Sequence, residues 1–297
     1  MNRSMTIFGC GYLGSELARQ ALSRGFQVNA LTHNPETAEA LRVSGVHSVV
    51  EAELGDDSWH QCITSDQDFV VNCVGASGTG LAGYVKSYVD GQVSISGWAE
   101  KVGIGTFVFT SSVSVYPQTD RSLVDENSSC EGVSDRGALL LAAEGIGFPG
   151  PASVERSFVL RLAGIYGPGR HVFLDRLRAG EPEWPGNGEA FLNLIHRDDA
   201  CSAIWATLES PLARPGRIYN LSDGQPVPRM EVVSWLAEQT GTKMPRFSSG
   251  SGPSPSLQSI ALPPNRKIDN RRIREELDWD PVYPSFREGY LDLLEKE

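Results

Sequence analysis

Residues 5–14 read Met-Thr-Ile-Phe-Gly-Cys-Gly-Tyr-Leu-Gly, and this stretch decides the fold. Its first half is a short apolar run that ends at glycines, as a buried β-strand does. Residues 13–23 follow with helical spacing, because Leu13, Leu17 and Ala21 recur on one face. The sequence therefore predicts a strand, a glycine turn and a helix at the start of the chain.

The glycines of this turn form the pattern GxGxxG. Gly9 permits a tight turn, Gly11 lets the backbone approach a pyrophosphate, and Gly14 lets the helix pack closely on the strand. The backbone amides and the positive dipole of the helix N-terminus hold phosphate groups there without Lys or Arg. The predicted cofactor-binding positions are Gly9, Gly11, Tyr12, Leu13 and Gly14, together with Gly75 after a later strand.

Strand-like and helix-like segments alternate through the first half of the chain. The strands are nearly all apolar, which is typical of a parallel sheet covered on both faces by helices. Repeated βα units predict an α/β fold with a doubly wound parallel sheet. The predicted strands cover residues 5–9, 26–32, 46–50, 68–74, 106–111 and 157–162, and the predicted helices cover 13–23, 35–43, 81–102, 134–145, 198–209, 229–240 and 270–277.

The second half begins differently. Glycine and proline are dense over residues 164–188, which indicates turns. Residues 248–256 have the Ser, Gly and Pro composition of a flexible linker. Two interpretations of this linker stay open: a plain surface loop, or a lid over a ligand.

The composition excludes several classes of partner. The chain has 297 residues, of which 40% are apolar and 21% charged, which is globular composition. Its length suits roughly two domains or one large α/β unit. A net charge of −11 argues against nucleic acid and anionic membrane surfaces as partners, since both attract positive fields. No transmembrane or signal segment is recognisable, so we expect a cytoplasmic protein.

The pattern of cysteines also fits a cytoplasmic protein. They are widely spaced, odd in number and without a CxxC pair, which predicts reduced thiols and neither a disulfide framework nor a metal site. They are Cys10, Cys62, Cys73, Cys130 and Cys201.

The end of the second predicted strand bears on the choice between NAD and NADP. An acidic residue there would hydrogen-bond the ribose 2′-hydroxyl of NAD and repel a 2′-phosphate. This chain has Thr32, His33 and Asn34 at that place and no carboxylate. Thr32 and Asn34 can donate to a phosphate, and His33 adds charge when protonated. The sequence thus favours NADP over NAD, although no arginine is present, and His33 could instead be a simple exposed loop residue.

Further segments follow the glycine loop in a fixed order. With that loop, the set resembles the extended short-chain dehydrogenases/reductases of the NAD-dependent epimerase/dehydratase superfamily over nearly the whole chain. The segments are Val-Asn-Cys-Val at 71–74, Thr-Ser-Ser-Val-Ser-Val-Tyr at 110–116, Arg-Leu-Ala-Gly-Ile-Tyr-Gly-Pro-Gly at 161–169, Ile-His-Arg-Asp-Asp at 195–199 and Ile-Tyr-Asn-Leu-Ser at 218–222.

This resemblance implies a division of the chain. A Rossmann domain would cover residues 1–165, with 195–222 returning to it. A smaller C-terminal α/β substrate lobe would comprise residues 166–194 and 223–297, with a small-molecule substrate between the two parts. The resemblance also implies homodimers that pair through the helices around residues 83–102 and 134–146.

Two departures from the family pattern stand out. The glycine motif is one residue tighter than the usual GxxGxxG. The family's Tyr-x-x-x-Lys is absent: counting back from Glu144, Arg136 stands at the tyrosine position and Leu140 at the lysine position. That tyrosine normally donates a proton to the substrate carbonyl, and the lysine lowers its pKa and holds the nicotinamide ribose. The chain therefore resembles an atypical branch of the superfamily.

Three residues are candidates for the remaining chemistry. Ser112 matches the family's catalytic Ser/Thr and would hydrogen-bond a substrate carbonyl, unless it only caps local backbone. Tyr116 is the nearest phenol and a possible substitute acid. Arg136 could bind an anionic group of the substrate or cofactor, since arginine stays charged, or it could be an exposed helix residue.

Other residues carry weaker signals. His196 and Asp199 match a family position that usually ties loops together. Arg170, just after the Tyr-Gly-Pro-Gly turn, could face the cleft, and the arginines of the segment 270–272 could meet a phosphate or carboxylate, although a solvated face is the plainer interpretation. Core or docking roles are expected for Trp184, Trp205, Trp235 and Trp279.

Two functions from different classes follow. The first is an NAD(P)-dependent oxidoreductase or epimerase-like enzyme acting on a small polar or sugar-derived substrate. The second is a sensor or scaffold protein that binds NADP(H) without turnover, which the loss of the usual Tyr and Lys motivates.

Overall fold

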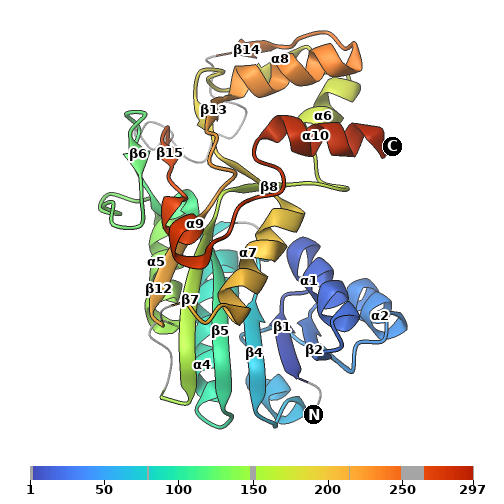
Figure 1. The fold of residues 1–297 in the computed structure, drawn as a ribbon, viewed down its shortest axis with the longest axis vertical. Helices are drawn as coiled ribbons and strands as arrows, with labels where there is room; N and C mark the ends of the chain where they lie inside the picture. The colour runs from blue at the N-terminus through green and yellow to red at the C-terminus, as the bar shows by residue number, and fades with distance from the viewer. Residues whose placement is uncertain (1–2, 79, 148–151, 214, 249–263, 297) are drawn as a thin grey trace.

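A computed structural model describes residues 3–78, 80–147, 152–213, 215–248 and 264–296 of the chain. Its centre is a seven-stranded parallel sheet in the order β12-β7-β5-β4-β1-β2-β3 (Figure 1). From β1 the chain winds outward to β3, returns to β4 beside β1, and winds the other way, so the predicted doubly wound sheet is confirmed. The strands are β1 (Ser4–Phe8), β2 (Gln27–Thr32), β3 (Ser48–Glu51), β4 (Gln67–Asn72), β5 (Ile104–Ser112), β7 (Val154–Leu162) and β12 (Arg217–Leu221).

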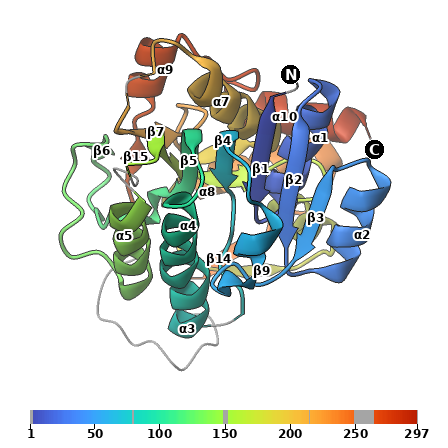
Figure 2. The same cartoon turned by 90° about the horizontal axis from the view of Figure 1, so that it is seen from below.

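Helices cover both faces of this sheet (Figure 2). Apolar side chains such as Leu17 and Ile204 are fully buried under α1, α7 and α9, and Trp59 and Trp98 lie in a second cluster on the other face. Burying both faces accounts for the near-continuous apolar strands. The helices against the sheet are α1 (Tyr12–Ser23), α2 (Pro35–Val43), α4 (Gly91–Ala99), α5 (Asp135–Gly147), α7 (Arg197–Glu209) and α9 (Arg271–Leu277).

The prediction of a single helix over residues 81–102 is wrong in detail. The segment consists of α3 (Gly80–Tyr84), a π-helical turn (Val85–Asp90) and α4, which ends at Ala99. The wider turn precedes Gly91, where an added Cβ would lie 2.9 Å from the Leu54 side chain. Periodicity at 3.6 residues per turn does not reveal such an inserted turn.

A second group of elements lies beyond the carboxyl ends of the strands (Figure 1). It has a core of its own, in which Trp184 and Phe286 are fully buried and Trp235 packs edge-on against Phe286. Trp205 and Trp279 are buried as well, but against the sheet. The group contains β8 (Gly164–Tyr166), α6 (Val172–Arg178), β9 (Glu183–Pro185), β10 (Phe191–Leu192), β11 (Leu194–His196), β13 (Val227–Pro228), α8 (Arg229–Thr240), β14 (Arg246–Ser248) and α10 (Phe286–Glu295).

Two features of this region differ from the sequence-based picture. The helices α6 and α10 were not predicted. α6 has only seven residues, whereas α10 carries the buried residues Phe286, Tyr290 and Leu293 at helical spacing, so its pattern is present in the sequence. The helix α9 comes from the segment 223–297 but packs on the sheet, with Ile273 fully buried there. Residues 249–256 of the predicted linker lie outside the described residues.

Asp223 marks the point where the chain leaves β12 for the second group of elements. Its side chain is only 5% exposed, and one carboxylate oxygen accepts a hydrogen bond from the amide of Gln225 at 2.9 Å. Burial, helped by the nearby acids Asp199 on α7 and Glu288 on α10, raises the pKa of Asp223 from 3.8 to about 7.

We predict that Asp223→Asn stabilises the fold increasingly as pH rises. Because the folded-state pKa is raised, the folded wild type binds the proton more tightly than the unfolded chain, and its stability falls as pH rises from about 4 to about 7. The advantage of the variant should grow by about 2–3 kcal/mol between pH 5 and pH 8. Urea unfolding at both pH values measures it, and a pH-independent difference would contradict it.

Candidate functional site

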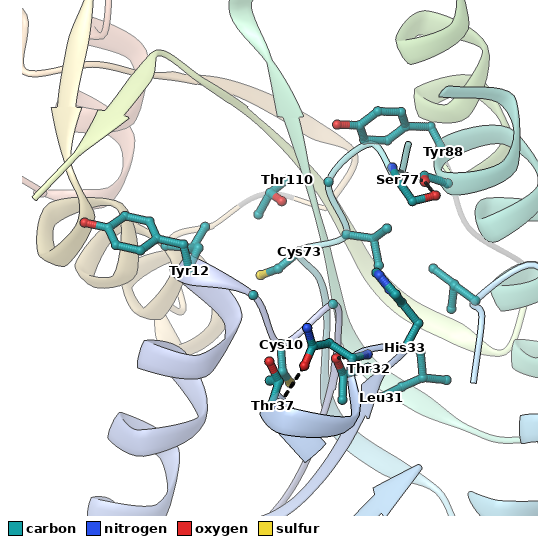
Figure 3. A pocket seen from close by; sticks show the side chains of 18 of the residues that line it. Cys10, Tyr12, Leu31, Thr32, His33, Thr37, Cys73, Ser77, Tyr88 and Thr110 are labelled. Atoms are coloured by element: carbon teal, nitrogen blue, oxygen red, sulfur yellow. Dashed lines mark hydrogen bonds between the residues drawn. The ribbon is translucent and has the colours of Figure 1, made fainter. Parts of the chain in front are cut away.

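A cavity of about 580 Å³ opens at the carboxyl ends of β1, β2, β4, β5 and β7. It lies across the point where the strand order reverses, the usual ligand position in a doubly wound sheet. Figure 3 shows Thr32, His33 and Thr37 gathered at one end, and Tyr12 and Thr110 farther along. The lining also includes Gly9, Gly11, Leu13, Glu53, Cys73, Gly75, Lys86, Tyr88, Ser111, Ser112, Leu162, Gly164 and Arg170.

The N-terminus of α1 faces this cavity without a side-chain cap. Gly11 is the N-cap residue, and no side chain accepts a hydrogen bond from the first-turn amides. By contrast, α2 is capped by Asn34, whose side-chain oxygen accepts from the amide of Thr37 at 2.8 Å. An uncapped helix end with free amides is an anion site.

The three glycines of the loop divide into two roles. A Cβ on Gly9 would lie 2.6 Å from the backbone of Val74, and one on Gly14 would lie 2.4 Å from the carbonyl oxygen of Gly9. Both glycines therefore serve close packing. A Cβ on Gly11 would meet no atom within 4 Å, because it would stand in the cavity. The loop thus fits a pyrophosphate at Gly11.

The polar groups at the end of β2 are partly engaged. Thr32 is buried, and its hydroxyl oxygen accepts from the amide of Asn34 at 3.2 Å. His33 is exposed at the cavity (Figure 3). The one carboxylate among the described lining residues is Glu53, which forms an ion pair with Lys86 at 3.4 Å. No carboxylate stands at the end of β2 itself.

Ser112 stands at the opposite part of the lining, at the end of β5. It is half-buried, and its hydroxyl oxygen accepts from the amide of Ser114 at 3.1 Å. This bond leaves the hydroxyl hydrogen available to donate. Nearby Thr110 donates to the carbonyl oxygen of Asn72 at 3.0 Å. Burial holds the pKa of the Cys73 thiol well above its usual value, so it is neutral.

Tyr116 lies outside the lining, in a buried polar network. Its hydroxyl donates to the side chain of Asn220 at 2.8 Å and accepts from Arg161 at 2.9 Å. Arg161 forms two hydrogen bonds to Glu144, at 3.0 and 2.7 Å, and Glu144 also accepts from Ser111 at 2.6 Å. Burial raises the pKa of Tyr116, although Arg161 counteracts it. The network links β5, α5, β7 and β12 behind the cavity wall.

The positions of the missing Tyr and Lys are occupied differently. Arg136 is exposed on α5, with its guanidinium 5.3 Å from the ring centre of Tyr84, and it does not line the cavity. Leu140 is buried in a small apolar cluster with Val115 and Tyr116. An apolar residue in that cluster cannot replace a lysine.

Tyr12 and Arg170 form a contact that sequence reasoning did not find. The guanidinium groups of Arg170 and Arg197 each lie 5.4 Å from the Tyr12 ring centre. Arg197 is paired with Asp198 at 2.9 Å, whereas no carboxylate of the described residues pairs with Arg170. Burial raises the pKa of Tyr12 to about 12, so the phenol is neutral. Arg170 is thus an unneutralised cation in the lining.

His196 and Asp199, the polar residues around the start of α7, have structural partners. His196 accepts from the amide of Asp198 at 3.3 Å through Nδ1 and so caps α7, and burial lowers its pKa. Asp199 accepts from the amides of Val282 and Tyr283, at 2.7 and 3.0 Å. These bonds tie α7 to the loop before α10.

The arginines before and in α9 are also paired. Arg271 forms an ion pair with Asp269, and Arg272 lies 3.4 Å from Glu126. The cysteines in the described segments are free thiols. Those segments hold no cluster of His, Cys, Asp and Glu side chains suited to a metal ion, and none of their helices has the length and apolarity to cross a membrane.

Comparison with known proteins extends this picture. The model of the family described as "NAD dependent epimerase/dehydratase family" matches residues 5–222. Protein YeeZ of Escherichia coli K12 is 32% identical over 289 residues, which cover 95% of this chain and 97% of that protein. The chain belongs to the NAD-dependent epimerase/dehydratase family.

A more distant curated relative and a solved structure are also similar to this chain. The 2-alkyl-3-oxoalkanoate reductase of Stenotrophomonas maltophilia is 27% identical, covering 78% of this chain and 74% of that one. The solved structure of MoeE5 with UDP-glucuronic acid and NAD has a TM-score of 0.81 and 24% identity, and covers 97% of this chain and 96% of that chain. This second likeness shows the shared fold.

We predict that Gly11→Val blocks coenzyme binding without destabilising the fold. The added side chain would fill the space at the α1 N-terminus, where no protein atom lies within 4 Å of a Cβ. Fluorescence titration should show NADPH affinity reduced by at least about 100-fold, or about 2.7 kcal/mol.

Gly14→Ala is the matched control, because it adds a Cβ to the same loop at a position where other protein atoms already fill the space. Its Cβ would collide with the Gly9 carbonyl, so it should lower the unfolding free energy by about 1–3 kcal/mol. A Gly11→Val protein that binds NADPH like the wild type would contradict this assignment.

Proposed function

We propose that the protein is an NAD(P)-dependent oxidoreductase or epimerase-like enzyme that acts on a small polar carbonyl compound or sugar derivative. The observation that carries this proposal is the continuity of the cavity. One space joins the uncapped N-terminus of α1 to the half-buried hydroxyl of Ser112. A dinucleotide held at the first end has its reactive part toward the second.

The residues that would hold the coenzyme come from three loops. The amide of Gly11 already donates to the carbonyl oxygen of Gly9 at 2.8 Å, so the amides of Tyr12 and Leu13 would bind the pyrophosphate. Gly11 itself would leave space for the phosphates, Gly9 and Gly14 would fix the turn, and Gly75 would leave room after β4. When bound, a nicotinamide coenzyme supplies hydride chemistry. The protein's part is to bind it, orient it and place a substrate beside it.

Arg170 adds a side-chain cation to this site. It lines the cavity, and its guanidinium lies 5.4 Å from the ring centre of Tyr12, the residue after Gly11. Among the residues that the structure describes, no carboxylate pairs with it. We assign it to the coenzyme phosphates, which would supply the missing counter-charge. The phosphate site of this acidic protein then combines backbone amides with one placed arginine.

The end of β2 supports a preference for NADP. Thr32, His33 and Thr37 present hydroxyl and imidazole groups to the cavity, and no carboxylate there repels a 2′-phosphate. Glu53, the acid of the lining, is already paired with Lys86. The proposed coenzyme is therefore NADP(H).

Ser112 is the proposed contact for the reacting carbonyl. Its oxygen is positioned by the amide of Ser114, so its hydrogen is directed elsewhere and can polarise a carbonyl. Tyr116 is the proposed positioning residue: its engaged hydroxyl anchors the segment after β5 to β12 through Asn220. Arg136 is exposed outside the lining, so we assign it no contact with the reacting atoms.

The relatives support a small polar carbonyl substrate. The Stenotrophomonas maltophilia relative is named as the reductase of an oxoalkanoate, and MoeE5 binds UDP-glucuronic acid with NAD. We propose that the substrate enters between the sheet edge and a lobe formed by residues 166–194 and 223–297, apart from α9.

We predict that His33→Asp lowers the affinity for NADPH by at least about ten-fold, or 1.4 kcal/mol, and leaves that for NADH unchanged or improved. The reason is that the new carboxylate would repel a 2′-phosphate. Fluorescence titration of both coenzymes measures the ratio. His47→Asp, at another exposed histidine outside the lining, is the control and should leave the ratio unchanged.

We predict that Ser112→Ala reduces kcat/KM for NADPH oxidation by about 100-fold or more across a panel of small carbonyl compounds, with NADPH binding retained. Tyr116→Phe should instead lower the unfolding free energy by about 1 kcal/mol and keep turnover by the folded protein. Unchanged turnover in Ser112→Ala would remove Ser112 from the chemistry. Binding of NADPH with no oxidation by any compound in the panel would favour the sensor function.

A further inference from the structure

Tyr12 and Tyr88 are the two phenols among the described residues that line the cavity. The hydroxyl of Tyr12 is enclosed, has no hydrogen-bond partner among those residues, and would lie 2.8 Å from a Cβ on Gly167. Tyr88 is half-buried and comes from the other side of the cavity. Figure 3 shows its ring extending away from its helical segment, with the hydroxyl foremost. Tyr88 is therefore the phenol that a ligand in the cavity can meet.

The π-helical turn Val85–Asp90 carries Tyr88 and is fixed to the loop after β4. The hydroxyl oxygen of Ser87, a buried residue of the turn, accepts from the amide of Ser77 at 2.9 Å. The two serine hydroxyls also lie 2.9 Å apart and share a hydrogen bond. Inserted π-helical turns are frequent at functional sites. Here the turn presents Tyr88 from a segment that is held in place.

The neighbours of Tyr88 place it beside Ser112. Its ring lies edge-on to that of Phe109, with the ring centres 6.4 Å apart, and Phe109 precedes Ser112 by three residues on β5. Tyr88 also packs against the apolar cluster that contains Val115, together with Val113, the residue after Ser112. Ser112 and Tyr88 line the same cavity. The phenol and the serine hydroxyl thus flank one part of it.

The same surroundings include the two positions where the family's tyrosine and lysine are missing. Leu140, at the lysine position, belongs to the apolar cluster against which Tyr88 packs. Arg136, at the tyrosine position, has its guanidinium 5.3 Å from the ring centre of Tyr84, and that ring centre lies 5.3 Å from the one of Tyr88. Both positions are on α5, which packs against the π-helical turn. A phenol therefore reaches this place from the neighbouring helical segment.

The protonation state of Tyr88 suits a proton donor. Burial and the neighbouring Tyr84 raise its pKa, and the backbone amide of Ala76 counteracts part of the rise. The phenol is therefore protonated at neutral pH. An amide N–H near its oxygen also stabilises the negative charge that remains after the proton leaves. On the same turn, Lys86 is neutralised by Glu53 at 3.4 Å.

We propose that Tyr88 is the proton donor of the reaction, in place of the absent family tyrosine. This inference rests on the proposed function, because it names the acid of that same site. As the carbonyl carbon accepts hydride from NADPH, the O–H bond of Tyr88 breaks and its proton joins the carbonyl oxygen, which Ser112 polarises. The phenolate regains a proton from solvent. The carbonyl compound is thereby reduced to an alcohol, and NADPH is oxidised to NADP⁺.

The first test follows the phenol itself and does not depend on turnover. Fluorine substitution makes a phenol more acidic, so Tyr88→difluorotyrosine can be titrated apart from the other tyrosines by the ultraviolet absorbance of its phenolate. We expect saturating NADP⁺ to lower the titration midpoint by roughly half to one pH unit, because its positively charged nicotinamide ring would lie beside the phenol. Tyr84→difluorotyrosine, outside the lining, is the matched control and should keep its midpoint.

The second test measures turnover with the panel of small carbonyl compounds. Tyr88→Phe should reduce kcat/KM for NADPH oxidation by about 100-fold or more and retain NADPH binding. Tyr84→Phe should keep kcat/KM within about two-fold of the wild type. In Tyr88→difluorotyrosine, the pH above which kcat/KM falls should move to lower pH together with the phenol midpoint. A purely structural role of the ring would not move it. Thermal unfolding shows that each variant is folded.

The outcomes separate this inference from the proposed function. With NADP⁺ bound, an unmoved Tyr88 midpoint, nearly full turnover by Tyr88→Phe or an unchanged pH profile overturns the assignment of Tyr88 and leaves the coenzyme site standing. A lowered midpoint without NADPH oxidation by any compound of the panel overturns it as well, because the phenol then has no substrate to protonate. Absence of NADPH and NADP⁺ binding overturns the proposed function, and this assignment with it.

Discussion

The first turn of α1 presents free backbone amides to the cavity, and the organisation of the site depends on this constraint. The amides are available because Gly11 caps the helix without a side chain. They are in place because Gly9 and Gly14 allow the loop to lie against Val74 and against itself at distances that a Cβ would forbid. The reversal of strand order between β1 and β4 opens the sheet edge at the same point. We therefore propose that a negative ligand binds here chiefly through backbone amides, which a net charge of −11 does not exclude.

The second constraint is the buried network around Arg161. The Glu144–Arg161 ion pair, completed by Ser111, Tyr116 and Asn220, joins the strands and the helix behind the cavity wall. Removing Glu144 or Arg161 would leave the other charge buried and unpaired, at a cost of about 3–5 kcal/mol. Glu144 and Tyr116 thus have a structural use here, while the family's usual Tyr and Lys positions hold an exposed arginine and a core leucine. The proposed chemistry rests on Ser112.

Much of the fold could be predicted from the sequence, because strand and helix periods leave direct traces in it. Apolar runs such as residues 68–74 and the glycine pattern at 9–14 predicted the parallel sheet and its ligand edge. The π-helical turn at Val85–Asp90 left no such trace, and neither did the short helix α6. Less of the candidate site could be predicted from the sequence, because the site depends on tertiary contacts. The local sequence pattern does not show that Tyr12 would stack with Arg170. Nor does it show that Arg266 would be buried with no carboxylate of the described residues paired to it.

The central claim is that one cavity holds an NADP(H) molecule along its length, from the β2 end to Ser112. A crystal structure of the protein with NADPH bound tests it most directly. We expect the pyrophosphate within hydrogen-bonding distance of the Tyr12 and Leu13 amides and of Arg170, the 2′-phosphate beside Thr32 and His33, and the nicotinamide ring next to Ser112. An empty cavity at saturating NADPH, or a coenzyme bound elsewhere or in the reverse direction, would contradict it.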